Sequence, residues 1–326
     1  MTAFSAAILN GYPRIGDAPS EQVLRRTLAK RDGGEASDAD VLTAVESTAE
    51  AAIREQESAG LSPVTDGQVA WPDPVSHLLR GLDGFVLGGL IRWFDTNTYI
   101  RQPERTGRVR RRGPVTVAAF EHARRVAGRP VKAVLTGPWT LASHTRVADG
   151  GTEALARELV PSIAEEVRAL AHAGATQIQI DEPSLTHEAA LPDVVREAAA
   201  SFAAGKGPSR LGLATYFGGV SALVPDLLAL PVDFLAFDLV QGAASLPALR
   251  RARAPMTLYL GLVDARNTRL EDPAAVAGAA RDVAQATGAA EVVVTTSNSL
   301  EFLPRGRARD KLAVLAKAAA LAGGAP

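Results

Sequence analysis

The chain has 326 residues, 47% of them hydrophobic, and its 35 basic and 36 acidic side chains leave a net charge of −1. Such a balance gives no electrostatic argument for a nucleic-acid or membrane-surface partner. No apolar run approaches the roughly 20 residues of a membrane-spanning helix, and the N-terminus has no basic segment followed by an apolar stretch, so we expect a cytoplasmic protein without a signal peptide. Cysteine is absent, which excludes disulfides, thiolate nucleophiles and cysteine-ligated metals.

Short apolar runs alternate with longer amphipathic segments along the chain. We expect strands over Ala3–Leu9, Ser62–Thr65, Lys132–Leu135, Thr176–Ile180, Arg210–Ala214, Asp233–Phe237, Thr257–Leu260 and Glu291–Thr295. We expect helices over Ser20–Lys30, Ser37–Ala59, Glu153–Ala173, Leu191–Ala204, Val220–Leu230, Leu246–Ala252, Pro273–Thr287 and Arg309–Leu321. Eight strand-then-helix units predict an α/β fold, a (β/α)8 TIM barrel in one domain over residues 1–326. A doubly wound open sheet is the alternative, but no Gly-x-Gly-x-x-Gly follows the first strand.

Residues 67–129 form an expected insertion after the second strand. Within it, Gly84–Gly88 and Ile91–Tyr99 predict a hairpin or clamp rather than barrel structure. The run Arg101–Arg112 that follows holds six arginines and one glutamate. Such a run is usually a solvated face, and the alternative is contact with an anionic tail of a substrate.

Two adjacent acids end the fourth expected strand. The tetrapeptide Asp181-Glu182-Pro183-Ser184 directly follows the alternating run Thr176–Ile180, and Pro183 stops the strand and stiffens the turn. A buried strand that ends in this way presents a carboxylate at the rim of a pocket on a rigid support. The alternative is that the two acids cap the helix that follows the turn.

Polar residues follow the other expected strands as well, and in a barrel the chemistry belongs to the carboxyl ends of the strands. These residues are Asn10-Gly11-Tyr12, Asp66-Gly67-Gln68, Thr136-Gly137-Pro138-Trp139, Thr215-Tyr216-Phe217, Asp238, Asp264-Ala265-Arg266 and Thr296-Ser297-Asn298. Capping explains any one of the aspartates in this set, but their recurrence favours a shared pocket. An acidic pocket with aromatic walls suits a small ligand that carries an amine and a flat ring. Asp181 is the expected anchor for the ammonium group, through a charge-assisted hydrogen bond worth about 1.5–3 kcal/mol.

Six motifs resemble one known family. They are Gly11-Tyr-Pro-Arg-Ile-Gly16, Leu135-Thr-Gly-Pro-Trp-Thr140, Ile178-Gln-Ile-Asp-Glu-Pro183, Thr215-Tyr-Phe-Gly218, Gly261-Leu-Val-Asp264 and Thr296-Ser-Asn-Ser-Leu300. In this order they resemble the cobalamin-independent methionine synthases, and the length is similar to one barrel of that two-barrel enzyme. Some motifs, such as Thr215–Gly218, look closer to the family's non-catalytic N-terminal barrel.

The resemblance implies a changed metal site. In the family's catalytic barrel, zinc activates the homocysteine thiolate and 5-methyltetrahydrofolate donates the methyl group. The positions that match its zinc ligands are Thr215, Phe217, Asp238 and Asn298. Thr215, Phe217 and Asn298 cannot serve as the family's zinc ligands, and Asp238 cannot hold zinc alone. No metal is therefore expected here.

The resemblance also implies roles for individual residues. Asp181 matches the carboxylate that grips the ammonium of the amino acid, and Gln68 replaces a second, glutamate anchor. The expected substrate-binding residues are Asn10, Gly11, Tyr12, Asp66, Gln68, Glu182, Tyr216 and Asn298. The expected folate-binding residues are Thr98, Tyr99, Trp139, His144 and His187. The expected catalytic residues are Asp181, Asp238, Asp264 and Arg266, the last of which replaces a proton-donating histidine of the family.

Three functions remain open from the sequence. The first is a methyltransferase that moves a methyl group from a reduced folate to a small amine-bearing acceptor, with a side chain such as Asp66, Asp238 or Asp264 as base. The second is a non-catalytic folate- or amino-acid-binding barrel, or a subunit that works with a protein partner. The third is a lyase or transferase for another small substrate on the same scaffold.

Overall fold

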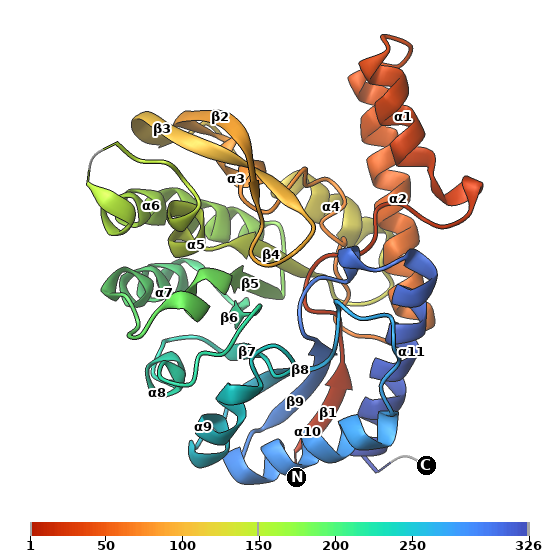
Figure 1. Ribbon diagram of the computed structural model, residues 1–326, viewed down its shortest axis with the longest axis vertical. Coiled ribbons are helices and arrows are strands. Elements are labelled where there is room, and N and C mark those ends of the chain that lie inside the picture. Colours follow the sequence, from red (N-terminus) through yellow and green to blue (C-terminus); the bar gives the residue numbers. More distant parts are fainter. Residues whose placement is uncertain (1, 149, 325–326) are drawn as a thin grey trace.

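The computed structural model describes residues 2–148 and 150–324, and its centre is a seven-stranded sheet with the strand order β1-β9-β8-β7-β6-β5-β4. Every neighbouring pair in this sheet is parallel. The strands are β1 (Ala3–Ala6), β4 (Lys132–Thr136), β5 (Gln177–Asp181), β6 (Arg210–Thr215), β7 (Phe234–Asp238), β8 (Thr257–Val263) and β9 (Glu291–Thr296). All seven lie where the sequence predicts a strand. Because they are parallel, their carboxyl ends lie at the same edge of the sheet, as Figure 1 shows.

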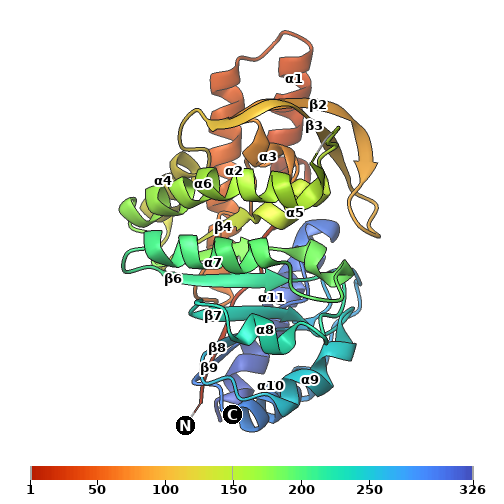
Figure 2. The ribbon, with the colours of Figure 1, turned by 90° about the vertical axis from the view of Figure 1, so that its left-hand side faces the viewer.

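Most helices of the chain cover the outer face of this sheet, whereas the first packs on the second and projects away from the sheet (Figures 1 and 2). The helices are α1 (Val23–Asp32), α2 (Asp38–Ser58), α3 (Ser76–Leu79), α4 (Val117–Val126), α5 (Pro138–Ser143), α6 (Gly151–His172), α7 (Asp193–Gly205), α8 (Val224–Leu228), α9 (Leu246–Arg251), α10 (Pro273–Thr287) and α11 (Arg305–Ala322). In α6 the buried residues Leu155, Leu159, Ile163 and Val167 recur every four positions. That spacing makes one apolar stripe, which the helix buries in the core.

Some expected boundaries are wrong. The first strand ends at Ala6 rather than Leu9, because the side-chain hydroxyl of Thr296, not a backbone carbonyl, accepts from the Leu9 N–H. The last helix begins at Arg305, directly after Pro304. The expected helix Val220–Leu230 shortens to α8.

The expected strand Ser62–Thr65 is reduced to an isolated parallel bridge between Val64 and Val131. Its backbone nevertheless bonds to both edges of the sheet. The Ser62 N–H donates to the Ala6 carbonyl oxygen at 2.9 Å, and the Lys132 N–H donates to the Val64 carbonyl oxygen at 2.8 Å. The segment therefore lies between β1 and β4.

A long antiparallel hairpin precedes α4. Its strands are β2 (Leu82–Arg92) and β3 (Tyr99–Arg111), with Leu82 opposite Arg111 and Arg92 opposite Tyr99. A hairpin is expected here, but its second strand is the arginine run, and residues 93–98 form the turn. Gly84 lies at a register shift with a φ of +94°, and a Cβ there would lie 2.6 Å from the carbonyl oxygen of Arg108. Only glycine permits this close approach.

The arginines of β3 contact acids of the same chain. Arg111 pairs with Glu166 at 2.6 Å, Arg105 with Glu158 at 2.7 Å and Arg110 with Asp83 at 2.6 Å. The first two pairs join the hairpin to α6, so part of the arginine run fixes the hairpin on the helical layer.

The hairpin turn lies over the carboxyl ends of the strands (Figure 2). The Phe94 ring lies 4.9 Å from the ring of Phe217, which follows β6, and the Trp93 ring lies 4.8 Å from that of His144. The Arg266 guanidinium, from the loop after β8, donates to the carbonyl oxygen of Asp95. Among the described residues, no helix is long and apolar enough to cross a membrane.

Candidate functional site

Alternation along the strands separates two sets of side chains. In β5, Ile178 and Ile180 belong to the large core cluster. Gln177, Gln179 and Asp181 alternate with them and therefore point to the opposite face. That face carries a second, small apolar cluster, formed by Ala7, Leu9, Ala214, Tyr216, Phe234, Ala236, Tyr259 and Val293. The site lies at the carboxyl-end side of this inner face.

Asp181 is the centre of a buried hydrogen-bond network. Only 2% of the residue is exposed. Its Oδ2 accepts from Asn10 Nδ2 at 2.8 Å and from the Tyr216 hydroxyl at 3.2 Å, and its Oδ1 accepts from Gln179 Nε2 at 2.7 Å. Burial raises the pKa of Asp181, whereas the bonds from Asn10 and Gln179 and the charge of Lys132 lower it.

These partners of Asp181 are neutral. In the part of the chain that the structure describes, no arginine, lysine or histidine forms a salt bridge with it. The cation that acts on it, Lys132, donates to Gln179 instead. A buried carboxylate without a direct counter-ion suits the binding of a cationic group.

The segment after β1 lies against this network. Asn10 holds Asp181 with its amide nitrogen, and its Oδ1 accepts from the Gly11 N–H at 2.8 Å. A Cβ at Gly11 would collide with Ser299 and would lie 3.1 Å from Gln68 Oε1. Gln68 itself has a φ of +54°, which is uncommon for a residue with a side chain. Asn10, Gly11 and Gln68 are therefore brought together beside Asp181, and their binding of a substrate stays a prediction.

A second carboxylate group lies at the ends of β7 and β8. Asp238 accepts from the backbone N–H groups of Phe217, Val240 and Gln241 at 2.9–3.1 Å, and burial raises its pKa to about 6. The Gln241 side chain donates to Asp264 at 3.3 Å and accepts from Asn298 Nδ2 at 3.1 Å. Asn298 Oδ1 is buried and has no hydrogen-bond partner among the described residues.

The four positions that the resemblance relates to zinc do not fit that ion. Phe217 offers no donor atom, and the Asp238 oxygens are taken by backbone N–H groups. Thr215 donates to the carbonyl oxygen of Ala236. Across residues 2–148 and 150–324, no cluster of three His, Cys, Asp or Glu side chains is arranged to hold a metal.

An aromatic cluster covers the strand ends. His144 and His187 lie 5.2 Å and 5.4 Å from the Phe94 ring, and Phe217 joins Phe94 to Tyr216. Phe94 and Phe217 have φ values of +47° and +72°. Non-glycine residues in this conformation are costly and concentrate at functional sites and clamps. Here the two strained residues contact each other over the Asp181 network.

The other residues expected to bind folate lie in different environments, and only some of them are buried. The Thr98 carbonyl oxygen accepts from the Trp93 N–H at 2.9 Å, so Thr98 supports the turn. Tyr99 is 52% exposed, while Trp139 is buried and its Nε1 has no partner among the described residues. Arg266 contacts the hairpin turn through Asp95.

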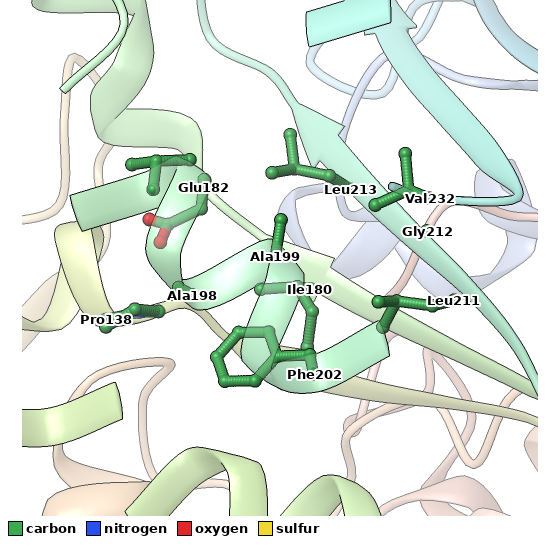
Figure 3. Close-up of a pocket in the computed structure, with 11 residues that line it drawn as sticks. Pro138, Ile180, Glu182, Ala198, Ala199, Phe202, Leu211, Gly212, Leu213 and Val232 are labelled. Carbon is green, nitrogen blue, oxygen red and sulfur yellow. The ribbon is translucent and has the colours of Figure 1, made fainter. Parts of the chain in front are cut away.

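Three expected binding residues face other parts of the molecule. The Tyr12 hydroxyl donates to Glu55 at 2.7 Å, and the Arg305 guanidinium lies over its ring. Glu182 accepts from the N–H groups of Trp139 and Thr140 and from the Thr140 hydroxyl at 2.7–2.9 Å, and so caps α5. Figure 3 shows it beside Pro138 in a cavity between β5, β6 and α7. Asp66 lines a cavity with Trp71 and Phe120 of α4.

Sequence reasoning missed four residues of the site. Gln179 donates to Asp181 and Lys132 donates to Gln179, while Trp93 and Phe94 of the hairpin turn pack against Phe217. The alternation Gln177-Ile-Gln-Ile-Asp181 was a usable signal for Gln179, since it puts both glutamines on the face of Asp181. A lone lysine at the start of a buried strand was the signal for Lys132.

Comparison with known proteins places the chain in a family. Residues 76–288 match the model for "Cobalamin-independent synthase, N-terminal domain". A 5-methyltetrahydropteroyltriglutamate–homocysteine methyltransferase of Mycobacterium tuberculosis (strain ATCC 25618 / H37Rv) is 33% identical over 257 residues, which cover 75% of this chain and 32% of that protein. The enzyme with the same name from Burkholderia pseudomallei (strain 668) is 33% identical over 307 residues, or 82% of this chain and 39% of that protein. The chain thus spans about a third of the length of these relatives.

Solved structures share the fold. A B12-independent methionine synthase from Shewanella sp. W3-18-1, in complex with selenomethionine, superimposes with a TM-score of 0.82 at 18% identity, covering 98% of this chain and 97% of that one. A putative B12-independent methionine synthase from Listeria monocytogenes gives a TM-score of 0.76 at 15% identity, covering 98% of both chains. With the family model matching most of its length, the chain belongs to the cobalamin-independent methionine synthase family.

Proposed function

We propose that the chain is a methionine-synthase-like methyltransferase whose inner-face site binds a small amine-bearing acceptor. The observation that carries this proposal is the buried Asp181 carboxylate, which accepts from neutral donors and has no direct counter-ion in the described part of the chain. An ammonium group of an amino acid supplies the missing positive charge. Asn10 and Gly11 would contact its carboxylate, and Gln68 and Asn298 would add hydrogen bonds.

The proposed methyl donor is a reduced folate, as the names of the related enzymes suggest. When bound, it supplies an activated N-methyl group. His144, His187, Thr98, Tyr99 and Trp139 are the residues proposed to hold it. The buried and unpaired Trp139 Nε1 fits a polar ring acceptor, and His144 presents a flat imidazole whose pKa burial lowers, so that it stacks as a neutral ring.

The proposed reaction does not use the family's thiolate zinc site, because the residues at the four matching positions do not fit the metal. The acceptor atom must then lose its proton to a side chain. Asp238 is the proposed base, since it lies at the site with a pKa near neutrality, with Asp264 as the alternative. As the acceptor atom bonds to the methyl group, the bond from the methyl carbon to the donor nitrogen breaks, and the proton taken by the base passes to that nitrogen. Arg266, tied to the hairpin turn, is proposed to stabilise the negative charge that develops there.

The proposed scaffold is a closed (β/α)8 barrel with an insertion at residues 67–129. The bonds from the segment 62–65 to both β1 and β4 support closure. In a closed barrel the inner face becomes a lined interior, which explains why polar residues such as Gln179 and Lys132 are fully buried there.

A second candidate function is a non-catalytic barrel that binds an amino acid or folate, alone or beside a protein partner. Two observations favour it. The matching family model is that of the N-terminal domain, and the chain spans about a third of its two named relatives.

The experiment is calorimetric titration with L-methionine and with 5-methyltetrahydrofolate, for the native chain and for Asp181→Asn. We expect the native chain to bind both, and Asp181→Asn to lose at least about tenfold in methionine affinity while its melting temperature changes by a few degrees at most. Binding of both ligands without methyl transfer to any amine tested would favour the second candidate. If neither ligand binds, the methyltransferase proposal is wrong.

A further inference from the structure

Lys132 is a buried lysine in the interior of the protein; burial lowers its pKa, and the charge of Asp181 opposes that shift and favours the ammonium form. It is 1% exposed, and its Nζ donates to the carbonyl oxygens of Leu9 at 2.8 Å and Ile8 at 3.3 Å and to Gln179 Oε1 at 2.7 Å. The ring of Tyr259 lies 4.8 Å from the same nitrogen. The three hydrogens of the ammonium group therefore have three acceptors, and an aromatic face adds to them. A buried charge that is satisfied so fully is expensive to build and points to a specific role.

Lys132 determines the orientation of the Gln179 amide. An ammonium group donates only, so the atom of Gln179 that faces it must be the oxygen. The amide nitrogen then points the other way, where it donates to Asp181 Oδ1 at 2.7 Å and to the Leu9 carbonyl oxygen at 3.1 Å. A flipped amide would place NH₂ against NH₃⁺ and would remove a donor from Asp181.

The Lys132 ammonium group also attracts the Asp181 carboxylate without contacting it, because the Gln179 side chain lies between the two groups. A direct ion pair would occupy the carboxylate and compete with any incoming ammonium. With Gln179 between them, the two charges attract each other, yet the oxygens of Asp181 keep only neutral donors. The other ionisable groups that act on this corner are Tyr216, Glu182 and Glu301, and none of them is a cation.

We propose that Lys132 is a positioning residue for amino-acid binding: through Gln179 it orients Asp181 and keeps that carboxylate ionised without neutralising it. This inference rests on the proposed function, in which Asp181 binds an ammonium group. It assigns the pH dependence of ligand affinity to a residue that never contacts the ligand.

The test is titration of L-methionine between about pH 5 and pH 9 into the native chain and into Lys132→Met, which keeps the length of the side chain. Loss of the cation raises the pKa of Asp181. The acidic limb of the affinity curve should then move upward by about one pH unit, and affinity at pH 5, on that limb, should fall about tenfold. The deaminated analogue 4-methylthiobutanoate should bind both proteins equally.

Lys311→Met is the matched control. Lys311 is equally buried on α11 but pairs with Glu271 at 2.8 Å, so this variant should show the stability cost of losing a buried lysine and keep the native pH profile. If Lys132→Met does not fold, Lys132→Gln, which also removes the charge but keeps a hydrogen-bond donor, should give the same shift.

The outcomes separate the two proposals. If the native chain binds methionine and the neutral Lys132 variant shows the same affinity and pH profile, the role of Lys132 is overturned and the proposed function is left intact. An equal shift in Lys311→Met would assign the effect to general destabilisation and also overturns it. Failure of the native chain to bind methionine at any pH overturns the proposed function and this inference with it.

Discussion

At the scale of single residues, neighbouring acids on one turn have different environments. Asp181 and Glu182 are consecutive, yet Asp181 points to the inner face and Glu182 to the helical layer. The cause is the period of two along a strand, which sends adjacent side chains to opposite faces. Glu182 therefore has the expected capping role, whereas the role of Asp181 in ligand binding stays a prediction.

Glu182→Ala should destabilise the protein by about 2–4 kcal/mol. The substitution leaves two backbone N–H groups and the Thr140 hydroxyl without an acceptor at the buried start of α5. Urea unfolding followed by circular dichroism measures the change. Glu121→Ala, an exposed change on α4, is the control and should stay within about 0.5 kcal/mol of the native protein. Equal values for the two variants would contradict the capping role.

At the scale of elements, the β2–β3 hairpin joins distant parts of the chain. Arg105 and Arg111 fix its strands to α6, while Trp93 and Phe94 hold its turn over the strand ends. The left-handed conformation of Phe94 is stable only because its ring packs on Phe217, His144 and His187.

Phe94→Ala and Phe94→Gly form a pair that measures this strain. Both variants lose the ring contacts, but only glycine accepts a φ of +47° without cost. We expect Phe94→Gly to be about 1 kcal/mol more stable than Phe94→Ala, measured by thermal unfolding. The reverse order would mean that the turn relaxes to an ordinary conformation once the ring is removed.

At the scale of the whole molecule, buried acids and a buried histidine have opposite effects on how the free energy of unfolding changes with pH. Burial raises the pKa of Glu182 to about 7 and of Asp238 to about 6, so their contribution is present at low pH and is lost as pH rises through these values. Burial lowers the pKa of His77 from 6.5 to about 4. The folded protein holds His77 neutral, so its contribution is present above pH 6.5 and is lost as pH falls toward about 4.

The His77 contribution is measurable by comparison with His77→Gln, which does not titrate. From pH 7 to about pH 4, the native protein should lose up to about 3 kcal/mol relative to the variant. Urea unfolding at each pH gives the two curves. Parallel curves would show that His77 titrates alike in the folded and unfolded chains.

The sequence by itself located seven parallel strands along the chain, a hairpin before α4 and Asp181 at the end of a strand, because periodicity and turn residues are local signals. It could not determine which side chains meet. The bond from Asn10 to Asp181 joins residues 171 positions apart, and the bond from Lys132 to the Leu9 carbonyl oxygen joins residues 123 positions apart. The orientation of Tyr12 toward Glu55 and the packing of Phe94 over Phe217 likewise depend on tertiary contacts. Alternation along a strand shows which side chains share a face, but contacts between residues distant in the sequence decide which partners they meet, and local sequence patterns do not give those partners.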